Sequence, residues 1–319
     1  MKYTRQFSLV ILCVFGLSNF SFAQEQAINT SSNINVEPYA QVIHEPLDEI
    51  SGIVKSRGRD NLYWVHNDSG DDARIFAINS DGETVMPTYS KFTRYGGEPE
   101  EGKEPWQGFK ILYAENRDWE DMTVDDNYIY ISDLGNNNND RHDLMIYAIG
   151  EIDPTASTQA AVIKGFPVRY PDQTRFPPSG SRPFDSESLF AADGNLYVIT
   201  KHRKTGRGSN YEAGAKLYRL DTEYTDQDNV LTLIDNHSEM IAATAAEVSP
   251  DGQRLAVLSY TAIWLFDKPE QGDQWLSSTF TKFNLNESQA RQVEAIVWED
   301  NDTLLFLNEQ RDMFRLNGI

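Results

Sequence analysis

Acidic residues recur at the starts of short apolar runs, and they are the side chains in this sequence with the clearest chemical use. In three runs a polar residue, a spacer and a glutamate stand in line: Asp118-x-Glu120, Asp185-x-Glu187 and Gln292-x-Glu294. Residues two apart in a β-strand face the same side, so both polar members of each opening point the same way. Carboxylates that converge repel one another unless protons or a cation compensate. Oxygen ligands without His or Cys favour Ca²⁺.

We therefore predict that the three glutamates share a Ca²⁺ ion, with Ser51 of a comparable opening beside them. The candidate ligands are Ser51, Glu120, Glu187 and Glu294. The alternative is a wide, hydrated channel in which the same carboxylates are merely solvated.

Two further carboxylates follow predicted strands and are candidates for catalysis. Asp68 lies in HNDSGDD (66–72) and Asp133 begins DLGNNNNDRHD (133–143). Either aspartate could orient a water molecule on a metal or act as a general base. The alternative is an Asx turn, because Asn, Asp and Gly dominate turns for conformational reasons.

A short basic stretch is the candidate for substrate binding. It comprises Lys201, His202, Arg203 and Lys204, and Arg141 is expected to join it at the rim of the channel. Arg and Lys bind phosphate oxygens through charge-assisted hydrogen bonds, which suits a small-molecule phosphate ester; an acidic saccharide would suit the same rim. The alternative is a solvated loop that balances charge locally.

The elements that would position these residues are short strands arranged in a repeat. Apolar alternating runs separated by Asp, Asn and Gly indicate antiparallel strands and turns. Five segments align with one another: 49–67, 118–133, 185–200, 244–259 and 292–309. A third apolar run follows each segment, and a fourth follows in four of them, near 83–92, 161–170, 230–236 and 278–285.

This repeat predicts an all-β, five-bladed β-propeller of four-stranded blades, with the five aligned openings lining its channel. The last unit lacks a fourth strand, and the unused run YAQVIHE (39–45) would pair with MFRLN (313–317) to close the ring. A sandwich or an open solenoid is the alternative. Residues 24–37 are expected to be a flexible N-terminal segment, and 38–319 a single domain.

Composition narrows the function classes. The chain has 28 Lys+Arg against 49 Asp+Glu, a net charge of −21, which excludes a nucleic-acid binder because phosphate recognition needs a basic face. Residues 1–23 resemble a signal peptide, with a basic start, an apolar run and Ser21-Phe22-Ala23 before the cleavage point. We expect a periplasmic or secreted protein, without a membrane span and most simply monomeric.

Two resemblances follow from these motifs. The order Ser51, Glu120, Glu187, a non-acidic position and Glu294 resembles the calcium-activated nucleotidase (apyrase) propellers, which implies a central calcium and nucleotide hydrolysis. Ala246 stands where that family has a second serine ligand. HNDSG (66–70), DWEDM (118–122) and DLGNN (133–137) are similar to exported bacterial propellers described as phytase-like or esterase-like.

Three functions remain open at this stage. The first is a calcium-dependent phosphohydrolase that acts on nucleotides or other phosphate esters. The second is a non-catalytic propeller that binds a ligand or protein and carries structural calcium. The third is a carbohydrate-active enzyme that uses two channel carboxylates.

Overall fold

The computed structural model describes residues 29–87, 105–205 and 211–319. The expected signal peptide, residues 1–23, lies outside these ranges. Regular structure in the described chain is almost entirely β: the short helices are α1 (Glu287–Ala290) and the 3₁₀ turn η2 (Trp275–Ser277). No helix in the described part of the chain is long and apolar enough to cross a membrane.

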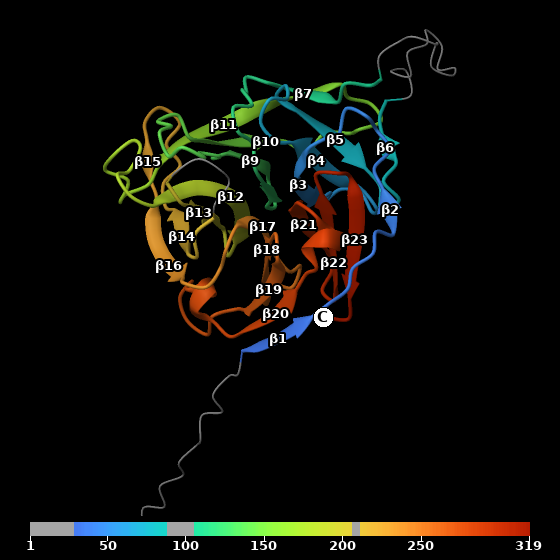
Figure 1. The fold of residues 1–319 in the computed structure, drawn as a ribbon. Helices are drawn as coiled ribbons and strands as arrows, with labels where there is room; N and C mark the ends of the chain where they lie inside the picture. The colour runs from blue at the N-terminus through green and yellow to red at the C-terminus, as the bar shows by residue number, and fades with distance from the viewer. Residues whose placement is uncertain (1–28, 88–104, 206–210) are drawn as a thin grey trace, which may run out of the picture.

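Five strands lie around a common centre, and each one contacts the next in a ring, with the fifth returning to the first (Figure 1). These inner strands are β3 (Ile50–Lys55), β8 (Met122–Val124), β12 (Arg182–Ala192), β17 (Ala243–Val248) and β21 (Val293–Asp300). These are the strands that the five aligned segments predict. The candidate carboxylates therefore lie where all five inner strands meet.

Each inner strand continues through two antiparallel neighbours, as the repeat predicts. The second strands are β4 (Tyr63–Asn67), β9 (Ile129–Asp133), β13 (Asn195–Arg203), β18 (Arg254–Ser259) and β22 (Thr303–Asn308). The third strands are β5 (Arg74–Ile78), β10 (Met145–Ile149), β14 (Ala215–Leu220), β19 (Ala262–Asp267) and β23 (Asp312–Asn317). Most second-strand residues are buried on both faces because neighbouring sheets pack against them.

The outer strands depart from a uniform repeat. Three units end in a fourth strand as expected: β11 (Gln159–Arg169), β16 (Thr232–His237) and β20 (Phe280–Asn284). In the first unit both β6 (Thr84–Val85) and β7 (Phe109–Leu112) pair with β5, and the rest of the strand expected at 83–92 falls largely outside the described residues. β7 also pairs in parallel with β11, to which β15 (Asn229–Val230) adds.

This parallel pairing joins the first two units into one ten-stranded sheet, so the described strands form four sheets. The architecture is all-β and propeller-like. Repeat alignment alone could not reveal the join, because it depends on hydrogen bonds between outer edges rather than on the pattern within a unit.

Both ends of the described chain are held at strand edges. β2 (Ala40–Gln41) pairs with β23, and Tyr39 and Val42 donate backbone hydrogen bonds to Met313 and Arg311 at 2.9 Å each. The expected pairing of 39–45 with 313–317 is therefore confirmed. Part of the segment expected to be flexible, 24–37, instead forms β1 (Thr30–Asn33), which pairs in parallel with the open edge of β20. An unpaired edge offers backbone groups that favour such a partner.

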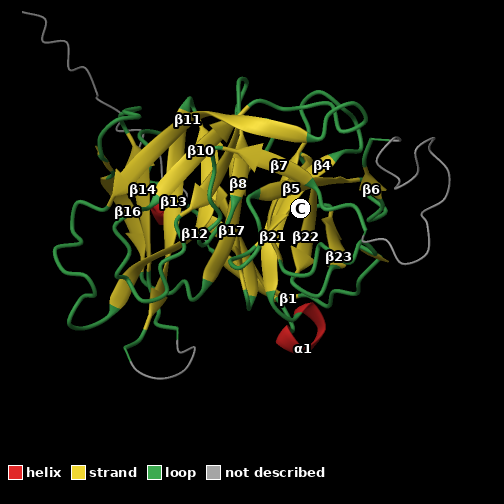
Figure 2. Cartoon of the chain, turned by 90° about the horizontal axis from the view of Figure 1, so that it is seen from above, coloured by secondary structure: helices red, strands yellow, loops and turns green. Residues whose placement is uncertain are grey.

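One face of the molecule collects two kinds of connection: the segments that enter the inner strands and the turns between second and third strands. We call it the mouth face. Helix α1 lies on it, just before β21, and projects from one side of the sheets (Figure 2). Long connections on one side of a rigid β scaffold commonly carry the functional residues.

The closing strand gives a direct test of the ring. Val42 is fully buried, whereas its neighbour Ile43 is 74% exposed. We expect Val42→Asp to lower the free energy of unfolding by about 3 kcal/mol or more, because it places a charge in the core. Ile43→Asp, the matched control, should change it by less than about 0.5 kcal/mol. Equal effects of the two variants in urea unfolding would contradict the closure.

Candidate functional site

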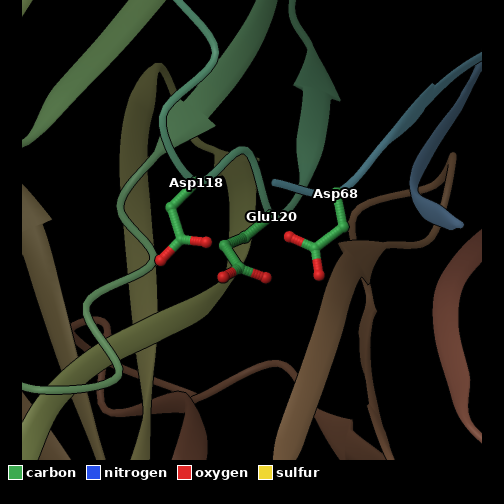
Figure 3. Close-up of side chains that lie close together, drawn as sticks. All are labelled: Asp68, Asp118 and Glu120. Carbon is green, nitrogen blue, oxygen red and sulfur yellow. The ribbon is translucent and has the colours of Figure 1, made fainter. Parts of the chain in front are cut away.

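Three carboxylates meet at the mouth of the channel. Asp118 and Glu120 lie in the segment that enters β8, and Asp68 follows the end of β4. One oxygen of each lies within 4.8 Å of one oxygen of the others, and Figure 3 shows the three groups side by side. Because Ca²⁺ binds oxygen at about 2.3–2.6 Å, two ligands of one ion stand at most about 5 Å apart. We call Asp68, Asp118 and Glu120 the acidic group. The spacing of their carboxylate oxygens fits a shared cation.

Gly135 of the DLGNN segment makes room for these carboxylates. Its backbone nitrogen donates to the Asp118 carbonyl at 3.1 Å. A methyl group on its Cα would overlap the carboxylate oxygens of both Glu120 and Asp118. A glycine is thus required here by space, and any side chain would displace the acidic group.

Glu120 is the most isolated charge of the group. Its exposed fraction is 3%, and no described residue donates a hydrogen bond to its carboxylate or forms an ion pair with it. Burial raises the pKa of Glu120 well above its usual range, and the negative charges of Glu187 and Asp68 raise it further. A buried carboxylate without a partner is costly, so this side chain favours a proton or a bound cation.

Burial and charge repulsion also act on Asp118 and Asp68. Burial raises the pKa of Asp118 to about 7, with added repulsion from Asp68 and Asp185. Burial also raises the pKa of Asp68. The three groups therefore oppose one another's ionisation, which is the electrostatic condition that a divalent cation relieves.

Further into the channel, Asp185 and Glu187 already have cationic partners. Glu187 forms an ion pair with Lys201, and Arg203 contacts Asp185 and, at 3.0 Å, Glu187. Lys201 is only 1% exposed. The register of β12 and β13, with Asp185 opposite Lys201, brings these charges together.

The structure places the residues of the predicted cationic rim in different surroundings. Lys201 and Arg203 lie two apart in β13 and face the channel carboxylates, so they do not form an open patch with the residues between and after them. His202 hydrogen-bonds Thr200 through its ring at 3.1 Å, and burial lowers its pKa to about 4. Lys204 is exposed.

The structure brings two of the four expected calcium ligands into one group of carboxylates. Glu120 and Glu187 lie together with Asp185, as convergence of the inner strands predicts. The Ser51 hydroxyl, however, donates to the Glu120 carbonyl at 2.5 Å. Glu294 accepts a hydrogen bond from the Tyr260 hydroxyl at 2.6 Å, and Tyr260 in turn accepts one from Lys201 at 3.1 Å. Glu120, which has no partner among the described residues, also lies with Asp68 and Asp118, so these three residues form the candidate site.

Asp133 and Arg141 position the site rather than face a substrate. Arg141 pairs with Asp133 at 2.9 Å and donates to the Gly135 carbonyl at 2.8 Å. The Asp133 carboxylate also accepts the backbone N–H of Asp118 at 3.0 Å and is 2% exposed. These bonds hold the segments that carry Asp118 and Gly135, and they engage the side chains that the sequence assigned to a base, Asp133, and to a rim cation, Arg141.

Asp121, next to Glu120, fixes the inner strands to one another. Its buried carboxylate accepts backbone hydrogen bonds from Leu189 of β12 at 2.8 Å, Ala246 of β17 at 3.1 Å and Met122 of β8 at 2.8 Å. The Asp121 carboxylate thus holds the scaffold, whereas the Glu120 carboxylate lies among the channel carboxylates.

Sequence reasoning missed Glu309, which lies between β22 and β23 on the mouth face. Burial raises its pKa to about 7, and the charges of Glu294 and Asp68 contribute. The Gln292 amide donates to its carboxylate at 2.9 Å. No motif marks this residue; only its position in the second-to-third-strand turn of the last unit could have singled it out.

The raised pKa of Asp118 predicts a pH effect on stability in chelator. Its ordinary pKa of 3.8 rises to about 7 on folding, so its stabilising contribution is complete below about pH 4 and is lost as the pH rises to about 7. Asp118→Asn should therefore lose less stability than the wild type over this range in urea unfolding. The same substitution at the exposed Asp126 should keep the wild-type slope. An unchanged slope in Asp118→Asn would contradict the electrostatic account.

No protein-family model matches the chain, and no curated protein matches it by sequence. Among solved structures it is similar to a luciferin-regenerating enzyme, with 9% identity, a TM-score of 0.41, and coverage of 89% of this chain and 79% of that one. It is also similar to the PQQ-bound aldose sugar dehydrogenase from Streptomyces coelicolor, with 12% identity, a TM-score of 0.42, and coverage of 88% and 97%. A third is a putative 6-phosphogluconolactonase from Bacteroides uniformis, with 11% identity, a TM-score of 0.37, and coverage of 81% and 63%.

Proposed function

We propose that the acidic group Asp68, Asp118 and Glu120 binds a divalent cation, and that this cation is Ca²⁺. The observation that carries this proposal is the buried Glu120 carboxylate, which is 3% exposed and has no partner among the described residues. Two further carboxylates lie at cation-sharing distance from it. All the ligand atoms are oxygen, and Asp68 and Asp118 reach the mouth face, where a hydrated ion could enter.

We propose that this site serves the hydrolysis of a phosphate ester. A bound divalent cation would neutralise phosphate oxygens and make a water molecule more acidic. Lys201 and Arg203 lie beside the channel carboxylates, but Glu187 and Asp185 already engage them. A phosphate group would thus depend on the cation more than on these two side chains.

Glu309 is our candidate for proton transfer. Its pKa of about 7 allows it to accept and return a proton near neutral pH. It lies close enough to Asp68 for that charge to raise its pKa. Asp68, Asp118 and Glu120 would hold the cation, and Gly135 would keep the space for their carboxylates.

Three further expectations, on blade number, export and oligomeric state, also remain proposals. We propose that the five inner strands head five blades of one propeller, that residues 1–23 direct export to the periplasm or exterior, and that the protein acts as a monomer. The β2–β23 pairing supports the closed ring. The sequence at residues 1–23 supports export.

Calcium titration followed by thermal unfolding tests the cation site. A ligand at a hundred times its Kd adds about 2.7 kcal/mol to stability, which for a chain of this size corresponds to roughly 5 °C. Glu120→Gln should be more stable than the wild type in chelator, because it removes a repelled charge, and should lose most of the calcium response. Glu270→Gln, an exposed control, should respond like the wild type. No calcium response in the wild type would overturn the site.

Phosphate release from phenyl phosphate, with calcium and with chelator, tests the reaction. We expect turnover that requires calcium, that Glu120→Gln abolishes, and that Glu309→Gln lowers by about a hundredfold or more while the calcium-induced thermal shift persists. Calcium binding without release of phosphate from phenyl phosphate or from glycerol phosphate would leave a cation-binding propeller and refute the phosphohydrolase.

A further inference from the structure

Arg182, the first residue of β12, is a cation without an anionic partner among the described residues. Its Nη1 donates to the side-chain oxygen of Asn138 at 3.2 Å, and no described carboxylate forms an ion pair with it. Arg203 stands opposite it in the register of β12 and β13, and there Asp185 and Glu187 neutralise the guanidinium. Arg182 therefore keeps an unbalanced positive charge in a chain whose net charge is −21.

The Arg182 guanidinium is partly removed from water. Its Nε is buried and has no hydrogen-bond partner among the described residues. Its Nη2 also lacks a partner in that part of the chain but, unlike Nε, is not closed off from solvent. A cation that water solvates incompletely and that no carboxylate neutralises is unfavourable. An oxyanion that accepts a hydrogen bond from Nη2 would relieve this cost.

Asn138 supplies a second donor next to this guanidinium. Because a guanidinium can only donate, the side-chain oxygen of Asn138 faces Arg182, and the amide nitrogen beside that oxygen stays available. Asn138 is exposed, and its amide nitrogen donates to no described residue. The next carboxylate along this loop, Asp140, is exposed and forms no ion pair with Arg182. Two N–H donors thus lie side by side and are open to solvent.

The loop that carries Asn138 is fixed to the start of β12. The backbone N–H of Asn136 donates to Asp185 at 2.7 Å, and that of Phe184 donates to the Asn139 side chain at 2.8 Å. The Asn139 amide also donates to the Asn136 carbonyl at 2.6 Å. The two donors are therefore positioned before a ligand arrives, which limits the entropy lost on binding.

The same loop borders the acidic group. Gly135 lies directly against its carboxylates, and Asn138 follows three residues later, a span of at most about 11 Å. The chain turns back on itself over this span, because the Asn139 N–H donates to the Asn136 carbonyl at 2.7 Å. One organic molecule can thus reach from the acidic group to Arg182.

We propose that Arg182 and Asn138 form an anion subsite that takes a carboxylate or a phosphate group. Both groups are oxyanions, which a guanidinium binds through charge-assisted hydrogen bonds. On the basis of the proposed function, the cation holds the ester phosphate, and this subsite holds a second acidic group of the same substrate. The substrate class is then a phosphate ester that carries a further carboxylate or phosphate.

Titration with sodium sulfate in chelator, followed by the NMR signal of the Arg182 Nε–H group, tests the subsite without any cation. Arg182→Gln identifies the signal by its loss, and we expect a saturable shift in the wild type. Asn138→Asp should abolish the shift and keep the fold, because a carboxylate at that position pairs with Arg182 and occupies the subsite. Arg175→Gln, which removes an exposed cation from the connection that enters β12, should bind sulfate like the wild type.

Calorimetry in calcium compares three phosphonates, which resist hydrolysis: hexylphosphonate, 6-phosphonohexanoate and hexane-1,6-bisphosphonate. We expect at least one of the two doubly acidic compounds to bind about tenfold more tightly than hexylphosphonate, and the tighter of them identifies the second group. Arg182→Gln should remove this preference and leave the calcium-induced thermal shift unchanged, whereas Arg175→Gln should keep both.

The subsite is overturned if sulfate produces no saturable shift, or if Asn138→Asp binds sulfate as well as the wild type. Equal affinities for the three phosphonates, in a protein that binds sulfate at Arg182, would overturn the second acidic group of the substrate. These failures are separable from failure of the proposed function. A calcium response without a sulfate shift rejects the subsite alone, and a sulfate shift without a calcium response rejects the cation site alone.

Discussion

The concentration of carboxylates where the inner strands meet is the constraint on which the rest of this structure depends. The entrances of β8 and β12 each carry two carboxylates, and Asp68, Glu294 and Glu309 lie around them. Two internal cations, Lys201 and Arg203, offset Asp185 and Glu187. No described cation forms an ion pair with Asp68, Asp118 or Glu120. Negative charge thus remains in excess at one defined place, and a divalent cation would balance it.

The scaffold tolerates this excess because separate residues hold the strands. The buried Asp121 carboxylate accepts hydrogen bonds from backbone N–H groups of three inner strands, so the channel carboxylates need not contribute to that junction. Arg141 and Asp133 hold the DLGNN segment, and Gly135 within it leaves space for Glu120 and Asp118. Stability and candidate function are therefore carried by neighbouring residues whose carboxylates have different partners.

The sequence predicted the strands and the meeting of the inner-strand carboxylates, because gap-free repeats place equivalent residues at equivalent positions. It also predicted the pairing of the N-terminal run with the last strand, from one unpaired run at each end. It could not show that Lys201 and Arg203 neutralise Asp185 and Glu187, since that depends on the register across β12 and β13. The same limit hid the β7–β11 join and the edge strand β1, both of which arise between units.

Anomalous diffraction from crystals soaked in a lanthanide that substitutes for Ca²⁺ tests the central claim most directly. The account predicts a strong peak within bonding distance of carboxylate oxygens of Asp68, Asp118 and Glu120, which calcium in excess displaces and which is absent in Glu120→Gln crystals. Lanthanide peaks confined to exposed carboxylates, with none at these three residues, would contradict it.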